Sequence, residues 1–89
     1  MIDPARRDSP AQDPAVLLLQ ALAWTCAEPS RAERLLDLTG LTAADLRERA
    51  MEPGVLNAVG DFLRAYDPDL IACAHAIGVQ PAVLAGATL

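Results

Sequence analysis

A pattern of glycines and apolar residues recurs in this chain at an offset of 38 positions. The segment 28–50 returns as the segment 66–88, and the match extends upstream of both. The aligned pairs include Gly40 with Gly78, Leu41 with Val79, Ala44 with Ala82, Leu46 with Leu84, Trp24 with Phe62 and Leu18 with Leu56. The pattern predicts one short helical unit written twice. Because few aligned residues are identical, shared helical periodicity is an open alternative to a true duplication.

The composition favours an all-α fold. Apolar residues make up 53% of the chain and are led by alanine and leucine, whereas aromatic residues make up 3%. This mixture prefers helices to strands. With 89 residues the chain has room for one modest core. We therefore expect a single all-α domain over 13–89, preceded by a polar, proline-rich tail over 1–12 that is disordered or loosely attached.

Prolines and capping residues divide the domain into six short helices, three in each unit. Five of the seven prolines fall at an expected helix start. The expected N-caps are Asp13, Ser30 in a capping box with Glu33, Thr42, and Asp67 before Pro68. Gly40 and Gly78 are expected to end helices in the left-handed conformation, as matched corners of the two units. The expected helices are 14–27, 31–39, 43–50, 53 to at least 63, 68–77 and 81–86.

The cysteines and the apolar runs indicate a location. Cys26 and Cys73 both lie in apolar helical runs, which predicts core thiols in a reducing cytoplasm. The first residues lack the apolar stretch of a signal peptide. No apolar run approaches the roughly 18 residues that a spanning helix needs. We expect a cytoplasmic protein without a membrane segment.

Residues able to carry catalysis or to bind a metal are scarce. The only histidine, His75, stands two positions from Cys73, and residues two apart on a helix point in different directions. Ser9 lies in the tail, and Ser30 is assigned to a cap. The sequence contains neither a phosphate-binding loop nor a dinucleotide-binding motif. We expect no enzymatic activity, no metal and no cofactor.

A small helix-turn-helix DNA-binding regulator is the alternative function. Ala74, Val79 and Leu84 have the spacing around Gly78 that two helices packed about a short turn require. The net charge is −5, however, and the helix after Gly78 has no side chain suited to pairing with a base edge. Nucleic acid is therefore an unlikely partner.

Several short motifs carry a resemblance to a known family. They are Gln20-Ala21-Leu22-Ala23-Trp24, Thr39-Gly40-Leu41, Asp45-Leu46-Arg47, Asp61-Phe62-Leu63 and Gly78-Val79. In these motifs the chain resembles a family of about 90-residue alphaproteobacterial proteins catalogued as a domain of unknown function. The resemblance covers residues from about 15 to the end. It implies a compact helical cytoplasmic protein and brings no activity, ligand or catalytic residue.

The remaining hypothesis is a non-catalytic module that binds another protein or a second copy of itself. The helices 14–27 and 68–77 are apolar nearly all round, more than a domain of this size can bury completely. Trp24 is either a core residue matched by Phe62 or part of an exposed apolar strip. The candidate partner-binding residues are Leu17, Gln20 and Trp24 for the strip, and Arg31, Arg34, Arg47 and Arg49 for an acidic partner.

Overall fold

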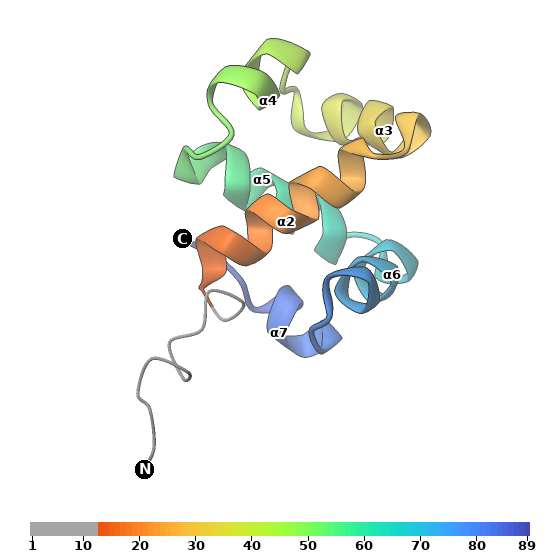
Figure 1. The fold of residues 1–89 in the computed structure, drawn as a ribbon. Helices are drawn as coiled ribbons and strands as arrows, with labels where there is room; N and C mark the ends of the chain where they lie inside the picture. Colours follow the sequence, from red (N-terminus) through yellow and green to blue (C-terminus); the bar gives the residue numbers. More distant parts are fainter. Residues whose placement is uncertain (1–12) are drawn as a thin grey trace.

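The structure, a computed structural model, describes residues 13–89. These residues form six helices and no strand, which confirms the all-α prediction (Figure 1). The tail predicted over 1–12 lies outside the described residues. None of the helices in this part of the chain has the length and apolar character needed to cross a membrane. The helices are α2 (Pro14–Cys26), α3 (Pro29–Thr39), α4 (Ala43–Glu48), α5 (Pro53–Arg64), α6 (Asp67–Ile77) and α7 (Pro81–Ala85).

The bounds of the helices follow the repeat. Helices α3 and α6 both have 11 residues, and they begin and end at positions that match at the offset of the repeat. Helices α4 and α7 also begin at matching positions, Ala43 and Pro81. The structure thus contains the two predicted three-helix units, α2–α4 and α5–α7.

Helix α2 is the central helix of the domain. It packs against α5 and α6 of the second unit as well as against α3 of its own unit. Four of its apolar side chains are buried: Leu17, Leu18, Ala21 and Leu22. The two units therefore interlock through α2 and α5 rather than standing side by side, and α2 is apolar nearly all round because neighbours surround much of it (Figure 1).

Glycines end the second helix of each unit, as predicted. Gly40 follows α3 with φ of 76°, and Gly78 follows α6 with φ of 80°. The left-handed region is strained for residues that carry a Cβ, so glycine is the residue of choice at both positions. The Gly40 N–H donates to the Leu36 carbonyl, and the Val79 N–H to the Ala74 carbonyl, each at 2.9 Å.

Two predicted N-caps hold and two are wrong. Asp13 accepts from the Ala15 N–H, and Thr42 forms a reciprocal capping box with Asp45. The Ser30–Glu33 box does not form, because α3 already begins at Pro29. The Glu28 carboxylate takes the capping role and accepts both the Arg31 N–H, at 2.9 Å, and the Ser30 hydroxyl.

The N-cap of α6 is Tyr66, without a side-chain bond, rather than Asp67. Helix α4 ends at Glu48, two residues earlier than expected. These differences at helix ends are one or two residues long, within the range over which helix termini fray.

A candidate protein-binding surface around Trp24

The three residues of the candidate strip on α2 differ in their exposure to solvent. Leu17 is 1% exposed, Gln20 is exposed and Trp24 is half-buried. The residues share one side of α2, but the covering of that side changes along the helix. Near the start of α2, Leu17 belongs to a buried cluster with Leu18, Leu56 and Ala87. Trp24, near the end of α2, packs against the edge of the core and keeps part of its ring in solvent.

The side chain of Arg31 stacks over the ring of Trp24. Its guanidinium carbon is 3.7 Å from the centroid of the indole ring, the geometry of a cation–π contact. The same guanidinium donates through Nη2 to the Trp24 carbonyl, one of the last carbonyls of α2. The Nε atom is buried and has no hydrogen-bond partner among the described residues. Arg31 thus fixes the orientation of the indole relative to α3.

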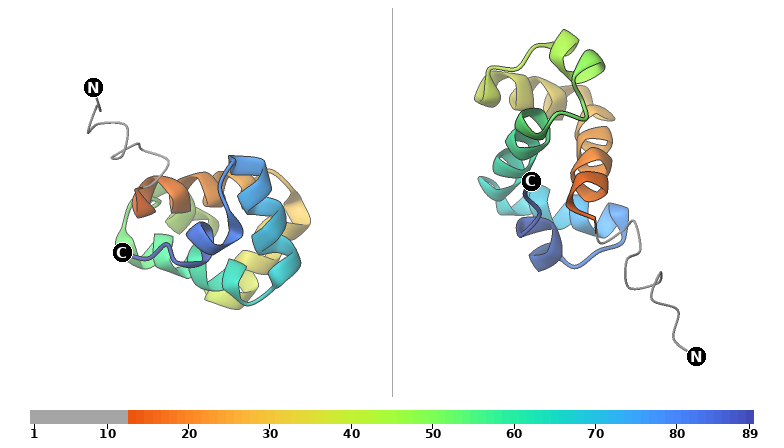
Figure 2. Two further views of the ribbon diagram at one scale, coloured as in Figure 1. Left: turned by 90° about the horizontal axis from the view of Figure 1, so that it is seen from below. Right: turned by 90° about the vertical axis from the view of Figure 1, so that its left-hand side faces the viewer.

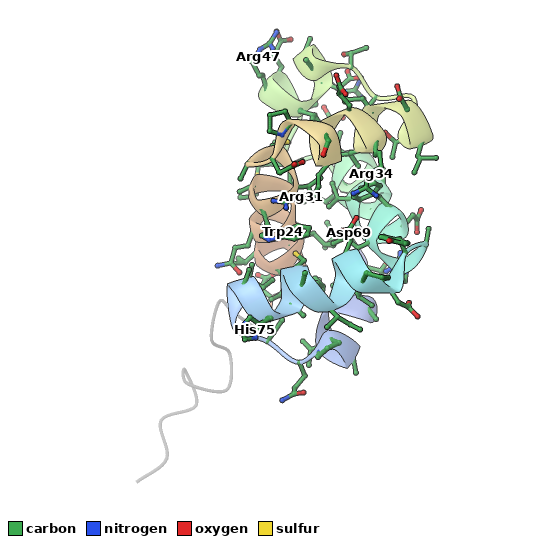
Figure 3. The ribbon with its side chains drawn as sticks, turned by 90° about the vertical axis from the view of Figure 1, so that its right-hand side faces the viewer. Trp24, Arg31, Arg34, Arg47, Asp69 and His75 are labelled. Carbon is green, nitrogen blue, oxygen red and sulfur yellow. The ribbon has the colours of Figure 1, made fainter. Side chains whose placement is uncertain are left out.

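Arg34, one turn further along α3, reaches the second unit. Its Nη2 atom is 2.7 Å from Asp69 Oδ2 on α6, and the two side chains are 43% and 14% exposed. The guanidinium carbon also lies 5.6 Å from the ring centroid of Phe62 and 5.7 Å from that of Tyr66. Figure 3 shows Trp24, Arg31, Arg34 and Asp69 together in the middle of one face of the molecule.

Two exposed apolar side chains extend this group. Leu38 is 70% exposed and follows Arg31 and Arg34 on one side of α3, at the i, i+3, i+7 spacing. Tyr66 is 52% exposed. The acidic residue Asp37, three positions after Arg34, borders this side of α3, and Glu33 lies farther round the helix. We call the group Trp24, Arg31, Arg34, Leu38 and Tyr66 the α3 surface.

The predicted set of four arginines is divided between two places. Arg47 and Arg49 belong to the α4 region, and Figure 3 shows Arg47 at the end of the molecule, apart from Arg31 and Arg34. Arg49 forms ion pairs with Asp45 at 3.2 Å and with Glu52 at 2.9 Å. The structure therefore brings together only Trp24, Arg31 and Arg34 of the seven predicted residues.

Sequence reasoning missed Leu38, Tyr66 and the Asp69 contact. The i, i+3, i+7 spacing of Leu38 with the two arginines is visible in the sequence and was a usable signal. Tyr66 and Asp69 come from the other unit, more than 30 positions from Arg34, and no local pattern joins them to it.

The thiols and the histidine lie apart from one another. Cys73 is fully buried, and burial raises the pKa of its thiol to about 11, against the opposing effect of the Arg31 charge. Cys26 is exposed rather than a core residue, because it lies at the end of α2, beyond the part that its neighbours cover. His75 is exposed and lies in the last turn of α6 (Figure 3). Within residues 13–89 no three His, Cys, Asp or Glu side chains gather as metal ligands do.

The fold and the α3 surface define a small all-α protein with an aromatic and arginine-rich patch on one face. A family model described as "Protein of unknown function (DUF3572)" matches residues 11–89, and the chain belongs to this family. The resemblance to a family of unknown function is thereby confirmed. No curated protein and no solved structure matches the chain.

Proposed function

We propose that the protein is a non-catalytic, cytoplasmic module that binds another protein through the α3 surface. The observation that carries the proposal is a row of contacts at the junction of the two units: Arg31 stacks on Trp24, and Arg34, one turn further along α3, lies beside Tyr66 and pairs with Asp69. Tryptophan, tyrosine and arginine are the residues most enriched where protein interfaces concentrate their binding energy. The contacts with Arg31 and Asp69 hold these side chains in place before a partner arrives, which lowers the entropy cost of binding.

The charge of the surface favours an acidic partner. The surface carries two guanidinium groups, Arg31 and Arg34, in a chain whose net charge is −5, and the Asp69 carboxylate pairs with Arg34. Arg34 keeps enough exposure to accept a second carboxylate beside Asp69. A partner segment that presents a carboxylate to Arg34 and an apolar side chain to Leu38 fits both features.

A non-catalytic role agrees with the chemistry of the available side chains. A thiol with a pKa of about 11, as for Cys73, stays protonated at neutral pH and is a poor nucleophile. His75 is exposed and two positions away on α6, so it is not placed to activate that thiol. Both cysteines are free thiols, in keeping with a reducing compartment.

The DNA-binding alternative has weaker support. Helix α4 has only six residues, and Arg49 is occupied by Asp45 and Glu52. Helix α7 has five residues and no charged side chain. A mobility-shift assay at low salt tests this alternative, and a complex that is lost in Arg47→Ala would favour it over protein binding.

The experiment for the proposed function is a quantitative pull-down from nuclease-treated lysate of the source cells. Arg34→Gln is compared with Arg47→Gln, a matched change at the far end of the molecule. We expect one stoichiometric protein with the wild type and with Arg47→Gln, and at least a tenfold loss with Arg34→Gln. Circular dichroism checks that the variants remain helical. Equal recovery with both variants, or no stoichiometric protein at all, would overturn the proposal.

A further inference from the structure

The outer face of α6 is apolar and uncovered. Helix α6 buries Leu70, Cys73 and Ala74. On the opposite side the exposed residues between the acidic first turn and Gly78 are Ile71, Ala72, His75 and Ala76. Ile71 is 54% exposed. Three of the four are apolar, and the fourth is the histidine.

Comparison with the first unit shows that the fold does not require an apolar outer face on this helix. At the matching positions of α3 stand Glu33, Arg34, Asp37 and Leu38, three of them charged. The same helix in the same architecture thus accepts charged side chains at these places. The scarcity of charged side chains on this face of α6 is therefore not imposed by the fold, and an exposed apolar face lowers solubility.

We propose that a second copy of the chain covers this face, with the two α6 helices packed antiparallel about a twofold axis. In such an isologous contact each residue meets its counterpart reciprocally. The acidic residues Asp67 and Asp69 lie in the first turn of α6, and His75 lies in the last. Antiparallel packing places Asp67 of each copy beside the partner's His75, whereas parallel packing would place Asp67 against Asp67.

Charge and size agree with this occupant. Two chains of net charge −5 repel each other, so they approach most readily where acidic residues are few, and the four exposed residues of this face include none. Ala72 and Ala76 are small, which lets the two helix axes come close.

A helix of 11 residues is about 16 Å long, so the contact is smaller than the standard interface of about 800 Å² per partner. The dimer is therefore weak and reversible, with a dissociation constant on the order of 10–100 µM.

Sedimentation equilibrium of the full 89-residue chain between about 10 and 500 µM tests the proposal. We expect a monomer–dimer equilibrium whose dissociation constant rises at least tenfold in Ile71→Glu. The control Leu38→Glu makes the same kind of change at a similarly exposed position and leaves the equilibrium unchanged.

Charge exchange tests the orientation. Asp67→Lys weakens the dimer several-fold, and Asp67→Lys combined with His75→Asp restores it. A strict monomer at every concentration overturns the proposal, as does an equilibrium that Ile71→Glu leaves unaltered. A dimer that Leu38→Glu breaks would instead place self-association on the α3 surface.

Discussion

Helices α4 and α7 occupy matching places in the two units, yet only α7 belongs to the core. Helix α7 buries Leu84, which is 1% exposed, and Ala87 follows it into the interior. Helix α4 has no buried residue, and its matching Leu46 is only partly covered. Figure 2 shows α4 at one end of the molecule, away from the C-terminus. The same element thus closes the core in one unit and stands beside it in the other.

Helix α5 holds the end of the second unit in place. Arg64 donates to the carbonyls of Ala85 and Ala87, at 3.0 and 3.3 Å, and Asp61 fixes its guanidinium. Asn57 accepts from the Leu89 N–H at 2.8 Å. The matching positions on α2 are Cys26, Ala23 and Leu19, which cannot make such bonds.

This difference separates the tasks of the two units. In the second unit, polar side chains of α5 form hydrogen bonds that hold α7 and the C-terminal residues in place. The first unit places Arg31 and Arg34 beside Trp24 on the surface and leaves α4 held mainly by local bonds. We infer that the second unit provides most of the stability and the first unit the binding surface.

We expect the largest difference in the free energy of unfolding between the variants Leu84→Ala and Leu46→Ala. Removing a fully buried leucine side chain costs about 2–5 kcal/mol, because the cavity adds to the lost burial. For the half-buried Leu46 we expect about 1 kcal/mol. Urea unfolding followed by circular dichroism measures both. Equal losses would mean that α4 is as firmly docked as α7.

The second expected difference in stability is between the variants Arg64→Gln and Arg49→Gln. Arg64 loses hydrogen bonds from a charged donor to two carbonyls, which we expect to cost about 1.5–3 kcal/mol. Arg49 loses only exposed ion pairs with Asp45 and Glu52, which solvent screens, so we expect a much smaller loss of stability. Thermal unfolding of the two variants is a sufficient measurement. A cost for Arg49→Gln as large as for Arg64→Gln would argue against a loosely held α4.

The two glycines give the third comparison. Both have the same left-handed backbone, so the direct strain of an alanine is about 1–2 kcal/mol at either position. At Gly78 we expect the whole strain energy to be lost from the free energy of unfolding, because releasing α7 would expose Leu84 of the core. At Gly40 the chain can instead release α4, so the cost is limited to the small docking energy of that helix. Identical losses in urea unfolding would contradict this reasoning.

The smallest effect is a pH dependence confined to α4. The hydrogen bond from the Thr42 N–H is the main cause that lowers the pKa of Asp45 below its ordinary value. A group with a lowered folded pKa stabilises the fold above its unfolded pKa, near 3.9, and this contribution disappears as the pH falls through the folded value. Carboxyl NMR titration should therefore show Asp45 and the Leu46 amide shifting together below about pH 4.

The control is Asp45→Asn, which removes the titrating carboxyl group and should abolish the shift of the Leu46 amide. The matching residue of α7 is Val83, so the Leu84 amide should show no such shift. A step of equal size at Leu84 would mean that acid acts on the whole fold rather than on α4.

The sequence predicted those features that are decided by neighbouring residues. The helix ends at Gly40 and Gly78 and the N-caps at Asp13 and Thr42 all depend on interactions within one or two turns. Ser30 was assigned the wrong role because Glu28, two residues earlier, offers a carboxylate in the same place.

Features set by distant residues were beyond sequence reasoning. Leu17 is buried in a cluster that includes Leu56 and Ala87, 39 and 70 positions later in the chain. Arg34 belongs to the candidate surface through Asp69, 35 positions away. The candidate site could thus be predicted by residue type at Trp24 and the arginines, but not as one assembled group.

Photo-crosslinking in the source cells compares the binding roles of the two units most directly. p-Benzoylphenylalanine is placed either at Leu38, on the α3 surface, or at Ala76, its counterpart in the repeat. The account predicts that the label at Leu38 captures one other protein, that Arg34→Gln abolishes this adduct, and that the label at Ala76 captures a second copy of the chain. Capture of another protein only from Ala76, or an adduct at Leu38 that persists in Arg34→Gln, would contradict the assignment of the binding surface to the first unit.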